Sequence, residues 1–151
     1  MLYIHIGDEI TPSDGELLSQ FWVAGDDFAF PSADWSEFVY PLLCTWSDEL
    51  LNHQNSPSAR YTLYYWTGPY RIEIGQDGHK QLELKFTKDG KCRHTATLSY
   101  ENFAEMLYAA LRRTRALLYE NQLTETAEYQ FALQKISDRM RALKNVMPNN
   151  G

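Results

Sequence analysis

Hydrophobic and polar residues alternate in five short segments, which is the pattern of β-strands with one buried face. The first segment is residues 2–6, where leucine and isoleucine alternate with Tyr3 and His5. The other four are Tyr61–Trp66, Tyr70–Ile74, Gln81–Phe86 and Lys91–Leu98. Turns that contain glycine separate these four segments, and Asp-Gly pairs are strong hairpin signals. We therefore predict an antiparallel meander in the middle of the chain.

The alternation gives the predicted meander an apolar face and a charged face. The apolar face consists of Ile72, Ile74, Leu82, Leu84, Phe86, Cys92, Ala96 and Leu98. The charged face consists of Arg71, Glu73, Gln81, Glu83, Lys85, Lys91 and Arg93. We interpret the charged face as a solvated surface that carries cross-strand ion pairs.

A helical spacing begins near residue 35. Apolar residues recur at intervals of three and four over residues 35–52, which predicts an amphipathic helix. Asp34 and Glu37 have the spacing of a reciprocal N-cap at its start. Pro41 predicts either a kink in this helix or the first turn of a second helix that begins after Tyr40.

Two more helices are predicted at the C-terminal end of the chain. The first has an apolar stripe within residues 103–118, and the second has Thr124 as its expected N-cap. The apolar spine of the second helix is Tyr129, Leu133, Ile136, Met140, Leu143 and Met147. Its heptad spacing lasts for fewer than three heptads, so we expect packing on the preceding helix rather than self-dimerisation.

These elements predict a single α+β domain over residues 1–147, with residues 148–151 as a disordered tail. We expect an antiparallel sheet of four to five strands, with helices from the N-terminal third and the two C-terminal helices packed on its apolar face. The segment Ser13–Glu16 is expected to form a turn or a capping box before Leu17–Trp22.

The composition limits the classes of function. The chain has 151 residues, 44% of them hydrophobic, which excludes general disorder. Its formal net charge is −6, and an acidic balance counts against nucleic acid as a partner. No apolar run is long enough to cross a membrane, and the N-terminus lacks the pattern of a signal peptide, so we expect a cytoplasmic protein.

The charge is distributed unevenly along the chain. Residues 1–60 contain ten acidic residues and a single base, Arg60. Residues 61–151 contain the other ten acids and thirteen bases. An asymmetry of this kind bears on partners rather than on fold, because an acidic surface captures basic partners faster.

No motif for catalysis is recognisable. A P-loop, a nucleophile elbow and a His-Glu-x-x-His motif are all absent from the sequence. Cys44 and Cys92 are expected to be free thiols on buried faces. Cys92 and His94 point to the same side of a strand, but no further ligands lie near them, and we interpret His94 as a partly buried histidine. We therefore predict no catalytic residue, no metal and no cofactor.

Acidic and aromatic residues are interleaved over residues 21–38. We expect a loop there that Trp22, Phe28 and Phe30 anchor to the core and that presents Asp26 and Asp27 rigidly. Aromatic residues inside a polar rim are typical of interface hot spots.

The segments Phe21–Phe28, Trp35–Trp46 and Trp66–Tyr70 resemble the immunity proteins of bacterial polymorphic-toxin and contact-dependent-inhibition systems. The resemblance covers about half of the chain and lies in overall style, since no family motif identifies the binding residues. It implies a single acidic α+β domain without catalytic residues. Such proteins bind a cognate toxin domain, often a basic nuclease, and block its action.

The leading hypothesis is therefore a non-enzymatic inhibitor of a basic toxin domain, acting as a monomer or weak homodimer without nucleic acid or membrane as partner. The charge distribution selects its partner-binding residues, which are Asp26, Asp27, Phe28, Asp34, Glu37, Asp48 and Glu49. Two alternatives remain open. One is a small hydrolase or metal-dependent enzyme with a site assembled from dispersed residues, and the other is an adaptor that dimerises through its last helix.

Overall fold

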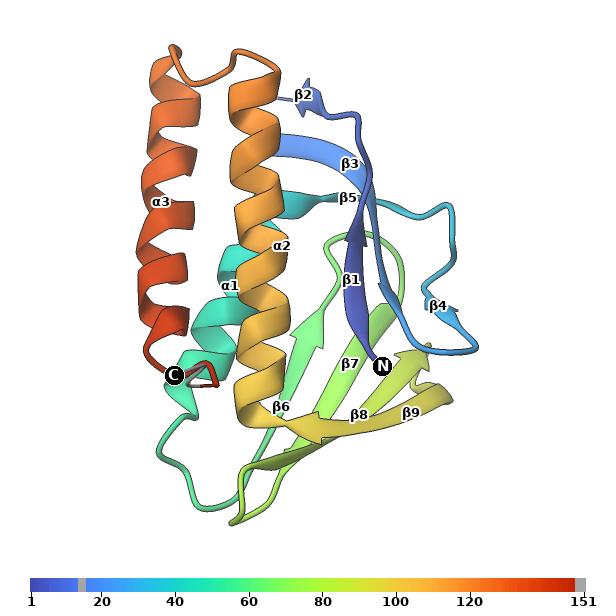
Figure 1. The fold of residues 1–151 in the computed structure, drawn as a ribbon. Helices are drawn as coiled ribbons and strands as arrows, with labels where there is room; N and C mark the ends of the chain where they lie inside the picture. The colour runs from blue at the N-terminus through green and yellow to red at the C-terminus, as the bar shows by residue number, and fades with distance from the viewer. Residues whose placement is uncertain (14–15, 149–151) are drawn as a thin grey trace.

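The computed structural model describes residues 1–13 and 16–148 of the chain. It has an α+β fold with two antiparallel sheets and three helices, in which α2 (Tyr100–Glu120) and α3 (Ala127–Lys144) lie side by side (Figure 1). The α+β class predicted from the sequence is confirmed, although the strands form two sheets rather than one. Of the predicted tail at residues 148–151, residues 149–151 lie outside the described residues.

The first sheet has five strands and is built around β3 (Glu16–Ala24). Its other members are β1 (Tyr3–Ile6), β2 (Thr11–Ser13), β4 (Ala29–Phe30) and β5 (Ser36–Phe38), each antiparallel to β3. Along β3 the odd-numbered residues from Leu17 to Val23 are buried, while Leu18, Gln20 and Trp22 are more exposed. Period-two burial of this kind produces a strand with one face on the core. Leu17–Trp22 is thus a strand rather than the start of a capped helix.

The second sheet is the predicted meander, with strand order β6-β7-β8-β9. Its strands are β6 (Ala59–Tyr64), β7 (Tyr70–Gln76), β8 (Gln81–Lys88) and β9 (Lys91–Ser99). Ile72, Ile74, Leu82, Leu84 and Phe86 are buried as expected.

The prediction that Cys92 is buried is wrong. At a register shift, Phe86 pairs with His94 but Thr87 pairs with Cys92, so Arg93 is an extra residue in β9. Cys92 therefore lies opposite Thr87 rather than on the apolar face of Phe86, and it is exposed. A bulge inserts one residue into a strand, so it reverses the alternation on one side of itself. Sequence periodicity does not reveal where that reversal occurs.

Helix α1 (Val39–Asn52) begins four residues later than predicted, because residues 36–38 pair with β3 as strand β5. Pro41 lies in the first turn of α1, where its missing N–H costs no helical hydrogen bond. The expected cap by Asp34 and Glu37 does not form, since the residue before the helix is Phe38 and no side chain caps it. Ser99 caps α2, and Thr126, rather than Thr124, caps α3.

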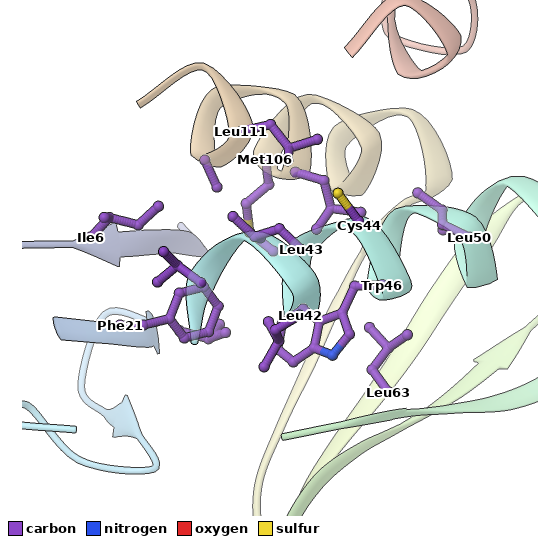
Figure 2. Packing of buried hydrophobic residues seen from close by; sticks show 14 of the residues in the cluster. Ile6, Phe21, Leu42, Leu43, Cys44, Trp46, Leu50, Leu63, Met106 and Leu111 are labelled. Atoms are coloured by element: carbon purple, nitrogen blue, oxygen red, sulfur yellow. The ribbon is translucent and has the colours of Figure 1, made fainter. Parts of the chain in front are cut away.

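Helix α1 lies at the centre of the core and contacts β3, β5, β6, α2 and α3. Figure 2 shows Leu42, Leu43, Trp46 and Leu50 projecting from it into the surrounding apolar cluster. Trp46 is fully buried, and its ring meets the ring of Phe21 edge-on with centroids 5.6 Å apart. The spine of α3 packs within the chain as predicted, with Tyr129, Ile136, Met140 and Leu143 buried.

Candidate partner-binding surface

The loop between β3 and β4 presents Asp26 and Asp27 to solvent. The amide of Gly25 donates a hydrogen bond to the Phe28 carbonyl at 2.9 Å, which closes the loop tightly. A Cβ atom at Gly25 would lie 2.3 Å from the Phe28 ring, so this close approach requires glycine. Asp26 pairs with the terminal ammonium of Met1, whereas Asp27 forms no ion pair with any described residue.

Aromatic contacts anchor this loop to the four-stranded sheet. The Phe28 ring stacks on His94 of β9, with centroids 4.4 Å apart and planes 9° apart. Phe30 is buried and meets Tyr65 and Phe86 edge-on. The predicted anchoring by Phe28 and Phe30 is therefore confirmed, and rings packed in this way limit the movement of the loop.

Trp22, the third predicted anchor, contacts a different part of the protein. It projects from the outer face of β3 and stacks on His5 of β1, with centroids 4.0 Å apart and planes 14° apart. Tyr3 lies two residues from His5 on the same strand face and is exposed. The outer face of the five-stranded sheet thus has an aromatic strip at its centre.

A hollow of about 410 Å³ lies on the same sheet. Its lining includes Gly7, Asp8, Glu9, Thr11, Leu18, Gln20 and Ser36. Asp8 pairs with Arg113 of α2 at 3.1 Å, while Glu9 makes no ion pair with a described residue. Asp8 and Glu9 are among the ten acids of residues 1–60 but not among the site residues predicted from the sequence. Their position directly after β1 was the only sequence signal that they flank the sheet.

Asp34 lies in the connection between β4 and β5 and is exposed. Its carboxylate accepts a hydrogen bond of 2.7 Å from the Ser32 hydroxyl and forms no ion pair with a described residue. Asp34 therefore belongs to the surface of the five-stranded sheet rather than to a helix cap.

Glu37 is fully buried and does not belong to this surface. Its carboxylate accepts hydrogen bonds from the amides of Trp66 and Thr67, at 3.0 and 3.2 Å, in the turn after β6. Burial raises the pKa of Glu37, and the hydrogen bonds from Thr67, Phe38 and Trp66 oppose that rise. Its selection as a partner-binding residue fails because β5 points this side chain inward.

Asp48 and Glu49 lie on α1, away from the loop that carries Asp26. Asp48 receives two hydrogen bonds from the Arg139 guanidinium of α3, at 3.2 and 3.1 Å. Glu49 is half-buried, and its carboxylate lies 4.0 Å from the His53 ring. These two acids thus support packing around α1 and do not extend the surface formed by Asp27 and Asp34.

The loop after β3 and strand β4 give His94 of β9 aromatic neighbours. Its ring contacts Phe28 and Phe30, and the Cys92 thiol donates to the His94 carbonyl at 3.4 Å. The interpretation of His94 as a partly buried histidine is confirmed. Over residues 1–13 and 16–148, no three His, Cys, Asp or Glu side chains gather closely enough to hold a metal ion.

No helix in the described part of the chain is long and apolar enough to cross a membrane. Comparison with protein-family models, with curated proteins and with solved structures gave no match for this chain.

Proposed function

We propose that this chain is a non-enzymatic inhibitor that binds a basic toxin domain through the outer face of its five-stranded sheet. One observation carries the proposal: residues 1–38, which form this sheet, contain eight acidic residues and no lysine or arginine. One of the eight, Glu37, is buried. A surface that carries carboxylates and no cationic side chains attracts a basic partner over several ångströms and accelerates its capture.

The acids without an ion-pair partner among the described residues are the groups that we expect a basic toxin domain to meet first. Glu9, Asp27 and Asp34 have no cation within ion-pair distance among the described residues, so their charges are available to a partner. Against a nuclease, these carboxylates would occupy the cationic surface that otherwise holds substrate phosphates. The rings of Phe28 and Phe30 restrict the loop of Asp27, so less conformational entropy is lost on binding.

The aromatic strip supplies apolar area on the proposed binding face. Tyr3, His5 and Trp22 project from the outer face of the five-stranded sheet. Large aromatic side chains at the centre of an interface contribute most of its binding energy when a polar rim excludes water. The proposed complex forms in the cytoplasm, where an inhibitor of this class meets its toxin.

The test begins with the genes next to the one for this chain: a basic toxin domain encoded there is coexpressed with the chain, and association kinetics are measured between the two purified proteins. Wild-type chain is expected to restore growth, and Asp27→Lys to slow association by about tenfold at low salt. Glu105→Lys is the matched control, because Glu105 is exposed on α2 and forms no ion pair with a described residue. It makes the same change in net charge and is expected to alter the rate by less than about twofold.

Two results would overturn the proposal. The first is failure of the wild-type chain both to bind the neighbouring toxin and to protect cells that produce it. The second is equal slowing by Asp27→Lys and Glu105→Lys, which would mean that only net charge matters and that the docking surface lies elsewhere.

A further inference from the structure

The outer face of the four-stranded sheet differs in charge from the five-stranded sheet. Strand alternation places Arg60 of β6, Arg71 of β7 and Lys85 of β8 on this face, together with Glu73 and Glu83. Arg93 is exposed at the register shift in β9. Arg60, Lys85 and Arg93 form no ion pair with a described residue, and Arg71 lies 3.9 Å from Glu73. The face therefore carries four cations and two acids, and three of the cations have no ion-pair partner among the described residues.

Two exposed aromatic residues lie at the end of β6. Tyr64 is 59% exposed and Trp66 is 49% exposed. Tyr64 is the last residue of β6 and pairs with Arg71, so it lies on the same face as that cation, and Trp66 follows in the bend after the strand. Side chains of this size contribute little to the core from such positions, whereas each ring offers a flat surface to a planar ligand.

Buried side chains hold the backbone under both rings. The indole Nε1 of Trp46 donates to the Tyr64 carbonyl at 2.9 Å, and the Glu37 carboxylate accepts from the Trp66 amide at 3.0 Å. Strand β6 is at the edge of its sheet, so no further strand supplies hydrogen-bond partners to its outer backbone groups, and these side chains supply them instead. The two exposed rings thus project from a fixed segment.

Gly75 leaves a depression beside the cations. The register places it between Arg60 and Glu83, and a Cβ atom there would meet nothing within 4 Å. The hollow at this position measures about 810 Å³, and the charged side chains in its lining are Arg60, Glu73, Asp77, Glu83 and Lys85. Its mixed lining of charges and backbone suits a polar ligand better than an apolar one.

We propose that this face binds single-stranded nucleic acid, with bases stacked on Tyr64 and Trp66 and phosphates on Arg60, Arg71, Lys85 and Arg93. Stacking platforms beside a cationic groove are the two features that single-strand recognition requires. An acidic peptide would use the cations but would leave both rings without a specific role. This inference goes beyond the proposed inhibitor function, because it involves the opposite sheet and a different ligand.

The net charge of −6 makes binding weaker but does not remove the local attraction. The acids that dominate the total belong to residues 1–38, in the other sheet. Charges separated by more than about 8–10 Å are largely screened at physiological ionic strength. We therefore expect moderate affinity with a steep dependence on salt.

The experiment measures fluorescence anisotropy of labelled uridine-rich RNA and thymidine-rich DNA of about twelve nucleotides, at about 50 mM salt. The wild-type chain is expected to bind both single strands at least about tenfold more tightly than a duplex of equal length. The double variant Tyr64→Ala/Trp66→Ala is expected to weaken binding by at least about tenfold. The matched control is Tyr119→Ala/Phe131→Ala, which removes two similarly exposed rings from α2 and α3 and should change affinity by less than about twofold.

A second pair of variants separates phosphate contact from stacking. Arg60→Glu/Lys85→Glu is expected to weaken binding and to reduce the slope of log Kd against log salt. Arg112→Glu/Lys144→Glu makes the same change of charge on the helices and should have a much smaller effect. If the Tyr64→Ala/Trp66→Ala protein does not fold, judged by its circular dichroism, the single edge-strand variant Tyr64→Ser provides the stacking test.

Three outcomes would overturn the inference. The wild-type chain could fail to bind either single strand at about 100 µM protein. The ring variants could retain full affinity, or heparin and polyglutamate could bind as tightly as RNA, and both results would indicate a site for polyanions without base stacking. None of these outcomes bears on toxin inhibition, which is measured with variants of the other sheet.

Discussion

Glu37 and Thr67, thirty residues apart in sequence, meet where strand β5 passes the turn between β6 and β7. One oxygen of the Glu37 carboxylate accepts from the Thr67 amide at 3.2 Å and from its hydroxyl at 3.3 Å. The neighbouring Trp66 amide donates to the same oxygen at 3.0 Å. A fully buried carboxylate thus joins the two sheets, and it supplies hydrogen-bond acceptors that a further strand would otherwise provide.

Removing this carboxylate should destabilise the protein. In Glu37→Ala the amides of Trp66 and Thr67 lose their acceptor in a buried site, so we expect a loss of about 2–4 kcal/mol in the free energy of unfolding. Thr67→Val removes only the hydroxyl and should cost about 0.5–1.5 kcal/mol. Urea denaturation of both variants measures these values, and equal losses would contradict the central role of the carboxylate.

The raised pKa of Glu37 predicts a dependence of stability on pH. Burial favours the protonated form, so the folded-state pKa lies above the unfolded one. The stabilising contribution is then complete below the unfolded pKa and is lost as the pH rises through the folded pKa. Glu37→Gln removes this titration, since glutamine does not ionise.

The measurement is the difference in unfolding free energy between wild type and Glu37→Gln at a series of pH values. As the pH rises through the folded-state pKa of Glu37, the wild type should lose stability relative to Glu37→Gln. The glutamine amide itself changes the stability by the same amount at every pH, so it does not affect this trend. Because Tyr65 also has a raised pKa, from burial and from the Glu37 charge, the series should end well below the range where tyrosine ionises. A difference that stays flat would contradict the prediction.

The Asp48–Arg139 pair should contribute modestly to the packing of α1 on α3. Arg139 donates two hydrogen bonds, but the Asp48 side chain is 50% exposed, so solvent screens much of the attraction. A double-mutant cycle with Asp48→Asn and Arg139→Met should give a coupling of about 0.5–1 kcal/mol that decreases with salt. A coupling that does not respond to salt would indicate that packing rather than charge is responsible.

The two thiols should differ in reactivity. Burial raises the pKa of Cys44 to about 11, so at pH 8 only about one molecule in a thousand carries its thiolate. Cys92 is exposed, so an aromatic disulfide reagent should modify one thiol quickly in the native protein and both in denaturant. Cys92→Ser should abolish the fast phase, whereas Cys44→Ala should leave it unchanged.

Regular patterns in the sequence determined most of the secondary structure. The meander, the two C-terminal helices and the inward packing of the last helix follow from periods of two and of three to four, because those periods are local properties of strands and helices. The anchoring by Phe28 and Phe30 was also predictable, since large aromatic residues within an acidic loop require burial.

Other features depend on contacts between residues that are distant in sequence, and only the tertiary structure determined them. Residues 36–38 have apolar neighbours that fit a helix, yet pairing with β3 makes them a strand and turns Glu37 into the core. The bulge in β9 at Arg93 exposes Cys92 in the same way, through register rather than composition. The charge asymmetry was already present in the sequence, but only strand pairing makes residues 1–38 a sheet of their own, separate from the sheet that carries Arg60, Lys85 and Arg93. Strand pairing joins residues far apart in the chain, and no local pattern encodes which strand a segment will meet.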